Sequence, residues 1–485
     1  MSGDDILYLS VQELSDLIRA RKISPVELTE SYLARLDQLG DKLGAVATIT
    51  RELALQEARS AEKEIAAGRT RGPLHGIPYG VKDLLATRGI RTTWGAPPFK
   101  DQVFDYDATV VRKLREAGAV LVAKLAMIEL AGGCGYSGGH ASLQGASRCP
   151  FNLDYWAGGS SSGPGAAVPA ALVGFAIGSE TLGSILAPSA FSACSGIRPT
   201  YGRVSRHGAM ALSWTMDKLG PMCRSAVDCG LVLNTIADRD VADPTSLDQT
   251  FAWWPPQKKS KPLAGKRVGV LQPAATPAPN AEAVAAFAKA LDVLSQLGAK
   301  LEDTELPPYY YQTIGTTLYS AEAASIFRPL VESGKILELV DEVQKAGFLA
   351  AMQIPAADYL DAFRLRAEIM AQLGKMFEAY DVLVALTYAN PAPKLDVDFG
   401  APQRPAGAGA ANPSAQPPRP ETKNLVAAGN IAGLPAISVP CGFTEKENLP
   451  LGIQFCADAA RDDVAIDFAV AYQSVTDWHK KRPSL

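Results

Sequence analysis

Two short runs of glycine and serine flank an apolar segment between residues 157 and 195, and this pattern constrains the fold more than any other. The first run, 158–163, contains three consecutive serines and leads into 166–173, which we expect to form a helix of small side chains. Such a helix packs closely against a sheet, and 173–177 is then expected to be a short buried strand. The second run, 178–184, ends in a serine at a tight turn, where several backbone N–H groups can converge on one oxygen. The alternative is a flexible linker, but a linker does not continue into about a dozen apolar residues that need burial.

A serine hydroxyl needs a base to take its proton before it becomes a good nucleophile. Because the chain contains four histidines, a Ser-His-Asp triad is possible in principle. However, no histidine lies in a sequence motif with either serine run, and no G-x-S-x-G motif occurs. Lys82 closes the short apolar segment 75–83, and burial there would lower the pKa of its amine until the neutral form accepts a proton. A lone lysine of this kind is usually a solvated surface residue, but beside two serine runs a Ser-Lys arrangement is the favoured interpretation.

These segments resemble the amidase signature family. The matching blocks are 75–83, 158–163, 178–185, 196–202, 430–440 and 451–455. The resemblance implies an α/β fold in which a central mixed, twisted β-sheet is covered by helices on both faces. It also implies an amidohydrolase that cleaves a carbon–nitrogen bond through an acyl-enzyme, without a cofactor or a metal.

The family uses a Ser-Ser-Lys triad, and residue-by-residue transfer assigns three roles in this chain. Lys82 is the expected base, Ser160 the bridging serine and Ser184 the nucleophile. The peptide bond between Gly159 and Ser160 is expected to be cis.

Two further sets of residues complete the expected site. The oxyanion hole is expected to consist of the N–H groups of Thr181, Leu182, Gly183 and Ser184. The residues expected to contact the substrate are Gly133, Cys134 and Ser160.

The chain also departs from the family pattern. Leu182 stands where a glycine is usual, which requires a negative φ or an adjusted turn. Leu186 stands where an arginine is common, so that stretch offers no cation for a substrate carboxylate. A neutral small-molecule amide or carbamate is therefore the expected substrate, because an unpaired buried carboxylate is costly. The alternative is that another arginine, such as Arg198 or Arg203, supplies the charge.

Two other functions remain open. The N-terminal and C-terminal blocks also resemble the glutaminase subunit of a tRNA-dependent amidotransferase, which works only within a complex. The departures at Leu182 and Leu186 allow a non-catalytic family member as well.

The composition indicates which class of protein this is and which binding partners it excludes. With 485 residues and 47% hydrophobic content the chain can bury a large core. A net charge of −4 produces no positive electrostatic potential that would attract nucleic acid or an anionic membrane.

The first residues are acidic where a signal peptide would be basic, and no stretch reaches about 18 uninterrupted apolar residues. Seven scattered cysteines without a C-x-x-C pair indicate reduced thiols and no zinc site. We expect a cytoplasmic enzyme that binds neither nucleic acid nor membrane directly; a homodimer is compatible with the sequence.

The order of predicted elements favours an α/β arrangement. Serines at positions 10 and 24 are expected to cap the first two helices. Further helices are expected at 51–67, 108–117, 228–238, 280–298, 316–380 and 422–431, and strands at 120–124, 266–271, 436–439 and 451–455.

We expect one large domain built from five segments. They are an N-terminal helical segment packed on the core (1–70), the amidase signature core (71–240), a mostly helical excursion or cap (241–395), a loop rich in Pro, Gly and Ala (396–421), and a C-terminal return to the core sheet (422–485). The loop is either a lid over the pocket or a disordered insertion.

Overall fold

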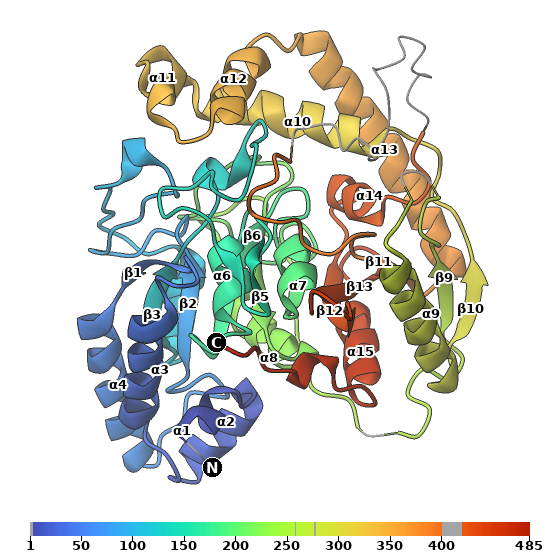
Figure 1. The fold of residues 1–485 in the computed structure, drawn as a ribbon. Coiled ribbons are helices and arrows are strands. Elements are labelled where there is room, and N and C mark those ends of the chain that lie inside the picture. The colour runs from blue at the N-terminus through green and yellow to red at the C-terminus, as the bar shows by residue number, and fades with distance from the viewer. Residues whose placement is uncertain (1–2, 258, 276–277, 400–419) are drawn as a thin grey trace.

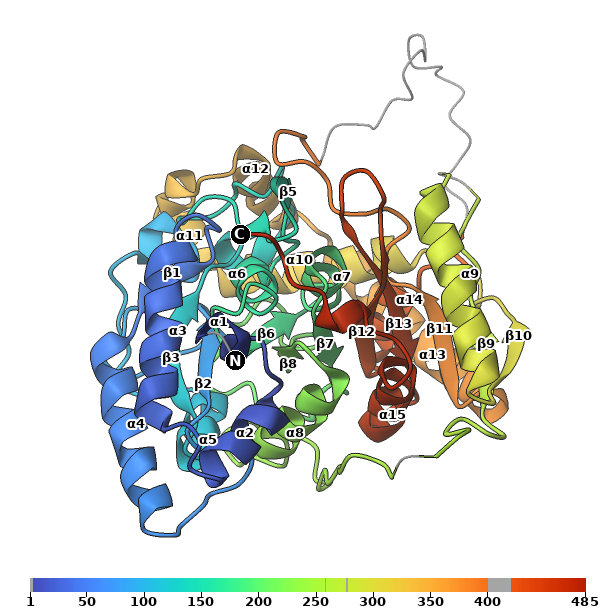
Figure 2. The same ribbon diagram turned by 60° about the horizontal axis from the view of Figure 1, so that its bottom comes forward.

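An 11-stranded mixed β-sheet forms the centre of the computed structural model, which describes residues 3–257, 259–275, 278–399 and 420–485. The strand order is β1-β3-β2-β6-β8-β7-β12-β13-β11-β9-β10. Helices cover both faces of this sheet, and Figure 2 shows it extending from β1 at one end of the molecule to β10 at the other. The expected α/β class with a mixed central sheet is confirmed.

The strands draw on almost the whole chain. Their bounds are β1 (Val46–Ile49), β2 (Pro78–Lys82), β3 (Val120–Leu125), β6 (Phe175–Glu180), β7 (Ser195–Arg198), β8 (Lys218–Cys223), β9 (Arg267–Val270), β10 (Lys300–Asp303), β11 (Val382–Leu386), β12 (Ala436–Phe443) and β13 (Pro450–Cys456), with a separate hairpin of β4 (Arg148–Cys149) and β5 (Asn152–Trp156). β2 pairs in parallel with β6, and Val81 lies opposite Ile177. The carboxyl ends of these two strands, which lead into the predicted site, are therefore neighbours.

Fifteen α-helices lie within the described residues. Their bounds are α1 (Gly3–Leu7), α2 (Val11–Arg19), α3 (Pro25–Leu39), α4 (Arg51–Ala66), α5 (Thr109–Glu116), α6 (Ser162–Ala167), α7 (Leu186–Ser192), α8 (Ala226–Ile236), α9 (Ala281–Gln296), α10 (Tyr311–Ile326), α11 (Arg328–Glu332), α12 (Glu342–Ala351), α13 (Ala356–Ala379), α14 (Leu425–Ala432) and α15 (Asp462–Gln473). Ser10 and Ser24 cap α2 and α3 in complete capping boxes, as predicted. None of the helices in this part of the chain combines the length and apolar character needed to cross a bilayer.

A helix forms at the first glycine–serine run, as expected, but its predicted extent over 166–173 is wrong. Helix α6 begins at Ser162, within the first glycine–serine run, and ends at Ala167. Pro169 has no N–H for helical bonding and disfavours a helical residue before it, and Ala171 adopts a left-handed φ of 56°. The following strand also starts later than expected, at Phe175, and continues to Glu180.

The region after the central strands forms a helical layer. Helices α10 to α13 lie together above the sheet in Figure 1, which agrees with the mostly helical character expected there. The single helical stretch expected at 316–380 is divided into four α-helices and a short 3-10 helix, Lys335–Glu338. Of the loop expected at 396–421, residues 400–419 lie outside the described part of the chain.

A buried ion pair fastens the chain after β7 to the C-terminal helix α15. The carboxylate of Asp462 accepts hydrogen bonds from the backbone N–H and the hydroxyl of Thr200, both at 2.8 Å, and from Arg203 Nε at 3.1 Å. Both charged side chains are almost fully buried.

We predict that Asp462→Ala lowers the free energy of unfolding by about 3–5 kcal/mol, because it leaves the Arg203 guanidinium buried without its charge partner. The matched control is Asp463→Ala, which removes a surface pair with Arg461 and should cost less than about 1 kcal/mol. Urea denaturation of the two variants and the wild type measures both effects. Similar losses in the two variants would show that the buried pair does not fasten this region.

Candidate active site

Lys82 lies at the end of β2 with its side chain fully buried. Its Nζ atom donates hydrogen bonds to Ser160 Oγ at 2.7 Å and to Ser179 Oγ at 2.9 Å. Burial lowers the pKa of the amine to about 7, and the carboxylates of Asp217 and Glu180 offset this shift only in part. Near neutral pH a large fraction of the amine is therefore unprotonated and able to accept a proton.

Ser160 is held by the close packing of the first glycine–serine run. The Gly159–Ser160 peptide bond is cis, as expected. A side chain on Gly158, which has a φ of 88°, would come within 2.5 Å of the backbone of Pro188, so this turn requires glycine. Helix α6 follows directly, and the serine is left buried against Lys82.

The buried carboxylate of Glu180 organises the second run. One of its oxygens accepts hydrogen bonds from the N–H groups of Ile185 at 2.8 Å and Leu186 at 2.9 Å. The other accepts hydrogen bonds from Arg198 at 3.1 Å and Asn430 at 2.7 Å. Burial opposes ionisation, but the Arg198 guanidinium, the Lys218 amine and these donors outweigh it and hold the pKa of Glu180 below its usual value. The charged carboxylate thus closes the turn between β6 and α7.

Four N–H groups inside this turn, from Thr181 to Ser184, donate no hydrogen bond to any described residue. Gly183 has a φ of 101°, whereas Leu182 is not in the left-handed region. The leucine that replaces a family glycine is therefore accommodated without strain, which meets the condition set by the sequence. The turn can offer several free N–H groups to one oxygen.

Ser184 lines a cavity of about 260 Å³. Its backbone carbonyl accepts a hydrogen bond from the N–H of Ser161 at 3.2 Å, which joins the two serine runs. Aromatic side chains dominate the wall, and these are Tyr136, Trp156, Phe191, Tyr319 and Tyr388. No charged side chain of the described residues lines this cavity.

None of the three residues expected to contact the substrate lines this cavity, and next to Ser160 only the neighbouring Gly159 reaches its wall. Gly132 lines it, whereas Gly133 and Cys134 follow directly and lie outside its wall. The Cys134 thiol faces the carbonyl of Ser320, and burial raises its pKa to about 12. Cys134 is therefore a neutral thiol, and its contact with substrate stays a prediction.

The arginines considered as partners for a substrate carboxylate and the histidines considered as bases lie outside this cavity. Arg198 binds Glu180 and Arg203 binds Asp462, and neither lines the cavity at Ser184. None of the four histidines lines it either. His75, for example, is buried beside Glu64, where burial lowers its pKa.

Two residues at the site were not singled out from the sequence. Ser179, the second acceptor of the Lys82 amine, lies inside the second run and could have been found as another serine of that run. Asp217 directly precedes β8 and gives no motif signal. Its carboxylate accepts hydrogen bonds from the hydroxyl of Thr181 at 2.6 Å and from the N–H groups of Leu212 and Ser213.

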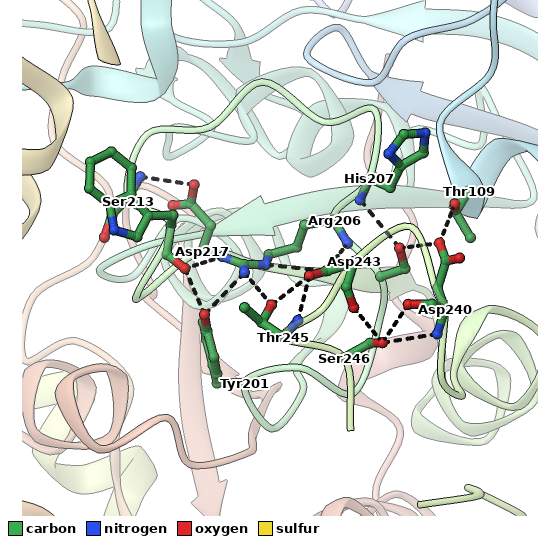
Figure 3. A network of polar contacts seen from close by, with 12 residues as sticks. Thr109, Tyr201, Arg206, His207, Ser213, Asp217, Asp240, Asp243, Thr245 and Ser246 are labelled. Atoms are coloured by element: carbon green, nitrogen blue, oxygen red, sulfur yellow. Dashed lines mark hydrogen bonds and ion pairs between the residues drawn. The ribbon is translucent and has the colours of Figure 1, made fainter. Parts of the chain in front are cut away.

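Asp217 belongs to a loop that a polar network keeps in place (Figure 3). The guanidinium of Arg206 donates hydrogen bonds to the carbonyl of Trp214 and to the hydroxyls of Tyr201 and Thr245, and it lies 3.6 Å from Asp243. Leu212 of the same loop lines the cavity at Ser184. The charge of Arg206 is thus used to position the wall.

A comparison with protein families identifies this architecture. The family model described as Amidase matches residues 27–465. The chain belongs to the Amidase family. It is thus an amidase-family enzyme whose chemistry concerns carbon–nitrogen bonds.

Similar proteins include amidotransferase subunits and a peptide amidase. A glutamyl-tRNA(Gln) amidotransferase subunit of Moorella thermoacetica is 36% identical over 504 residues, covering 99% of each chain. The native peptide amidase of Stenotrophomonas maltophilia superimposes with a TM-score of 0.80 at 29% identity, covering 98% of each chain. The corresponding glutamyl-tRNA(Gln) amidotransferase subunit of Thermotoga maritima gives a TM-score of 0.76 at 26% identity, covering 97% of this chain and 95% of that one. The family is therefore established, while its similar members differ in substrate.

We predict that the Lys82 amine titrates with a midpoint near pH 7, whereas an ordinary lysine has a pKa of about 10.4. NMR of protein labelled with ¹³C at the lysine side chains measures this, and Lys82→Met assigns the signal by removing it. A midpoint close to 10 would show that the amine is protonated at neutral pH and would contradict the electrostatic description of the site.

Proposed function

We propose that this amidase-family enzyme hydrolyses a neutral amide or carbamate through an acyl-enzyme on Ser184. The observation that carries the proposal is the buried Lys82 amine, whose pKa is lowered to about 7. It is hydrogen-bonded to Ser160, next to the cavity that Ser184 lines. This arrangement supplies a base for a serine without a histidine.

The proposed reaction begins with two linked proton transfers. Once Lys82 is neutral, its nitrogen can accept the Ser160 proton while Ser160 accepts the proton of Ser184. The Ser184 oxygen then attacks the substrate carbonyl carbon, and the resulting oxyanion accepts hydrogen bonds from the free N–H groups of residues 181–184. The proton returns from Lys82 through Ser160 to the leaving nitrogen, and the carbon–nitrogen bond breaks. Water then cleaves the acyl ester by the same relay.

The preference for a neutral substrate follows from the wall of the cavity. Free glutamine and other acidic amides carry a carboxylate, and no described side chain of this wall offers a cation to pair with it. Leaving a carboxylate desolvated without a partner costs several kcal/mol. The aromatic wall instead favours an uncharged, partly apolar group.

A second candidate is the glutaminase subunit of a tRNA-dependent amidotransferase. The 36% identity with one glutamyl-tRNA(Gln) amidotransferase subunit over 99% of the chain supports it. This candidate requires partner subunits and activity on glutamine in their presence, so co-purification of stable, stoichiometric partners would favour it over the first.

We predict that a fluorophosphonate adds one adduct to the wild-type protein and none to Ser184→Ala, because only a serine paired with a base reacts readily. Intact-mass measurement shows the adduct. The control Ser60→Ala, on the surface of α4, should be labelled like the wild type. Labelling of Ser184→Ala at the wild-type rate would rule out Ser184 as the nucleophile.

We also predict that kcat/KM for a neutral amide exceeds that for its carboxylate-bearing analogue by about a hundredfold or more, given the cost of an unpaired buried charge. Release of amine from matched pairs of amides, with glutamine included, measures this ratio. Equal or higher efficiency on the acidic analogue would contradict a neutral substrate and favour the amidotransferase function.

A further inference from the structure

A second and larger cavity, of about 970 Å³, adjoins the one at Ser184. Leu182, Gln312 and Tyr388 line both cavities, so these three residues form the boundary between them. Small-molecule sites usually have volumes of about 300–1,000 Å³. The smaller cavity falls below this range, whereas the larger one lies within it, near the upper limit. A substrate confined to the first cavity would leave this adjoining space unused.

Three segments that are far apart in the sequence build the larger cavity. Residues 271–274 directly follow β9, and residues 385–389 end β11 and follow it. These strands are parallel neighbours, and crevices outside the carboxyl ends of parallel strands are common ligand sites. Residues 420–426, which lead into α14, form the opposite wall.

Both charged side chains among its described lining residues are engaged by other residues. The Glu421 carboxylate accepts hydrogen bonds from the N–H of Gln312 at 2.9 Å and from the side chain of Asn424 at 2.6 Å. Lys423 forms an ion pair with Glu305 at 3.0 Å. Among the described lining residues, the cation Lys423 is thus already paired, and the Glu421 carboxylate would repel an anionic group.

Its wall nevertheless contains a polar atom without a partner. Gln454 of β13 is 1% exposed, and its side-chain nitrogen donates a hydrogen bond to the carbonyl of Leu386 at 3.3 Å. Its Oε1 atom accepts no hydrogen bond from the described residues. A buried acceptor is normally satisfied, so a ligand that carries an N–H donor would complete this site.

We infer that this cavity binds the remote arm of an elongated, uncharged, hydrogen-bonding substrate, in the manner of a short peptide chain whose scissile amide lies at Ser184. The inference rests on the proposed function and specifies its substrate class. An arm on the acyl side is the form to test, because it stays bound through acylation and deacylation and can assist both.

Equilibrium binding to the unreactive Ser184→Ala variant tests this inference. The two ligands are N-acetyl-tripeptide amide, which is long enough to extend past Tyr388, and acetamide, which is not. Calorimetry should show the long ligand binding at least tenfold more tightly. In Ser184→Ala combined with Thr422→Trp or with Ala274→Trp, which narrow the larger cavity, most of this gain should be lost while acetamide binding stays unchanged.

A matched control and a point substitution complete the design. Ala275 is exposed, adjoins Ala274 and does not line the cavity, so Ala275→Trp should keep the full gain. Gln454→Met, which removes the free acceptor at similar length, should weaken the long ligand by roughly three- to tenfold. Equal binding of the two ligands, or a gain that survives both narrowing variants, would overturn the inference.

Different results would reject the binding role of the larger cavity and the proposed hydrolysis at Ser184. Hydrolysis of short neutral amides by the wild type, without a gain for the long ligand, would reject the second cavity alone. A gain that the narrowing variants abolish, without release of ammonia from either ligand by the wild type, would support the cavity and reject the proposed hydrolysis.

Discussion

The burial of the Lys82 amine against hydroxyl oxygens is the constraint on which the site depends. No carboxylate of the described residues is hydrogen-bonded to its nitrogen, so burial is offset only in part, by the more distant charges of Asp217 and Glu180. Lys124, which is equally buried, instead has the carboxylate of Asp83 at 3.3 Å, a partner that favours the protonated form. Burial lowers the pKa of Lys124 as well, but the adjacent carboxylate of Asp83 opposes that shift, whereas Lys82 has only hydroxyl partners.

The rest of the site holds one serine of each run, Ser160 and Ser179, within hydrogen-bond distance of this amine. Glu180 fastens the turn between β6 and α7, while its own charge is balanced by Arg198, which in turn is bound to the carbonyl of Leu434 near the C-terminal blocks. The N–H of Ser161 joins the first run to Ser184 of the second. Residues from the middle of the chain and from its C-terminal blocks together position one short turn.

Much of this could be predicted from residue types and their order. The capping serines of α2 and α3 are local signals, and Lys82, Ser160 and Ser184 stood out because a resemblance covered each of their segments. The end of α6 could not be placed well, because apolar residues continue past Pro169 after the helix has ended. Four-residue strands such as β7 and β10 are too short to show a period, and their pairing joins distant segments. Asp217 contacts Thr181 of the second run only in the folded chain, because the two residues are 36 positions apart, so no sequence motif predicts this contact.

The account's central claim is that a neutral lysine activates the serine at position 184, and the pH dependence of its acylation tests this most directly. The rate of fluorophosphonate addition to the wild-type protein should rise with pH through about 7, as Lys82 loses its proton, and then level off. Lys82→Ala should react several orders of magnitude more slowly, and Lys82→Arg should not restore the rate, because a guanidinium keeps its proton. A near-wild-type rate in Lys82→Arg, or a wild-type rate that does not change between pH 6 and 8, would contradict the claim.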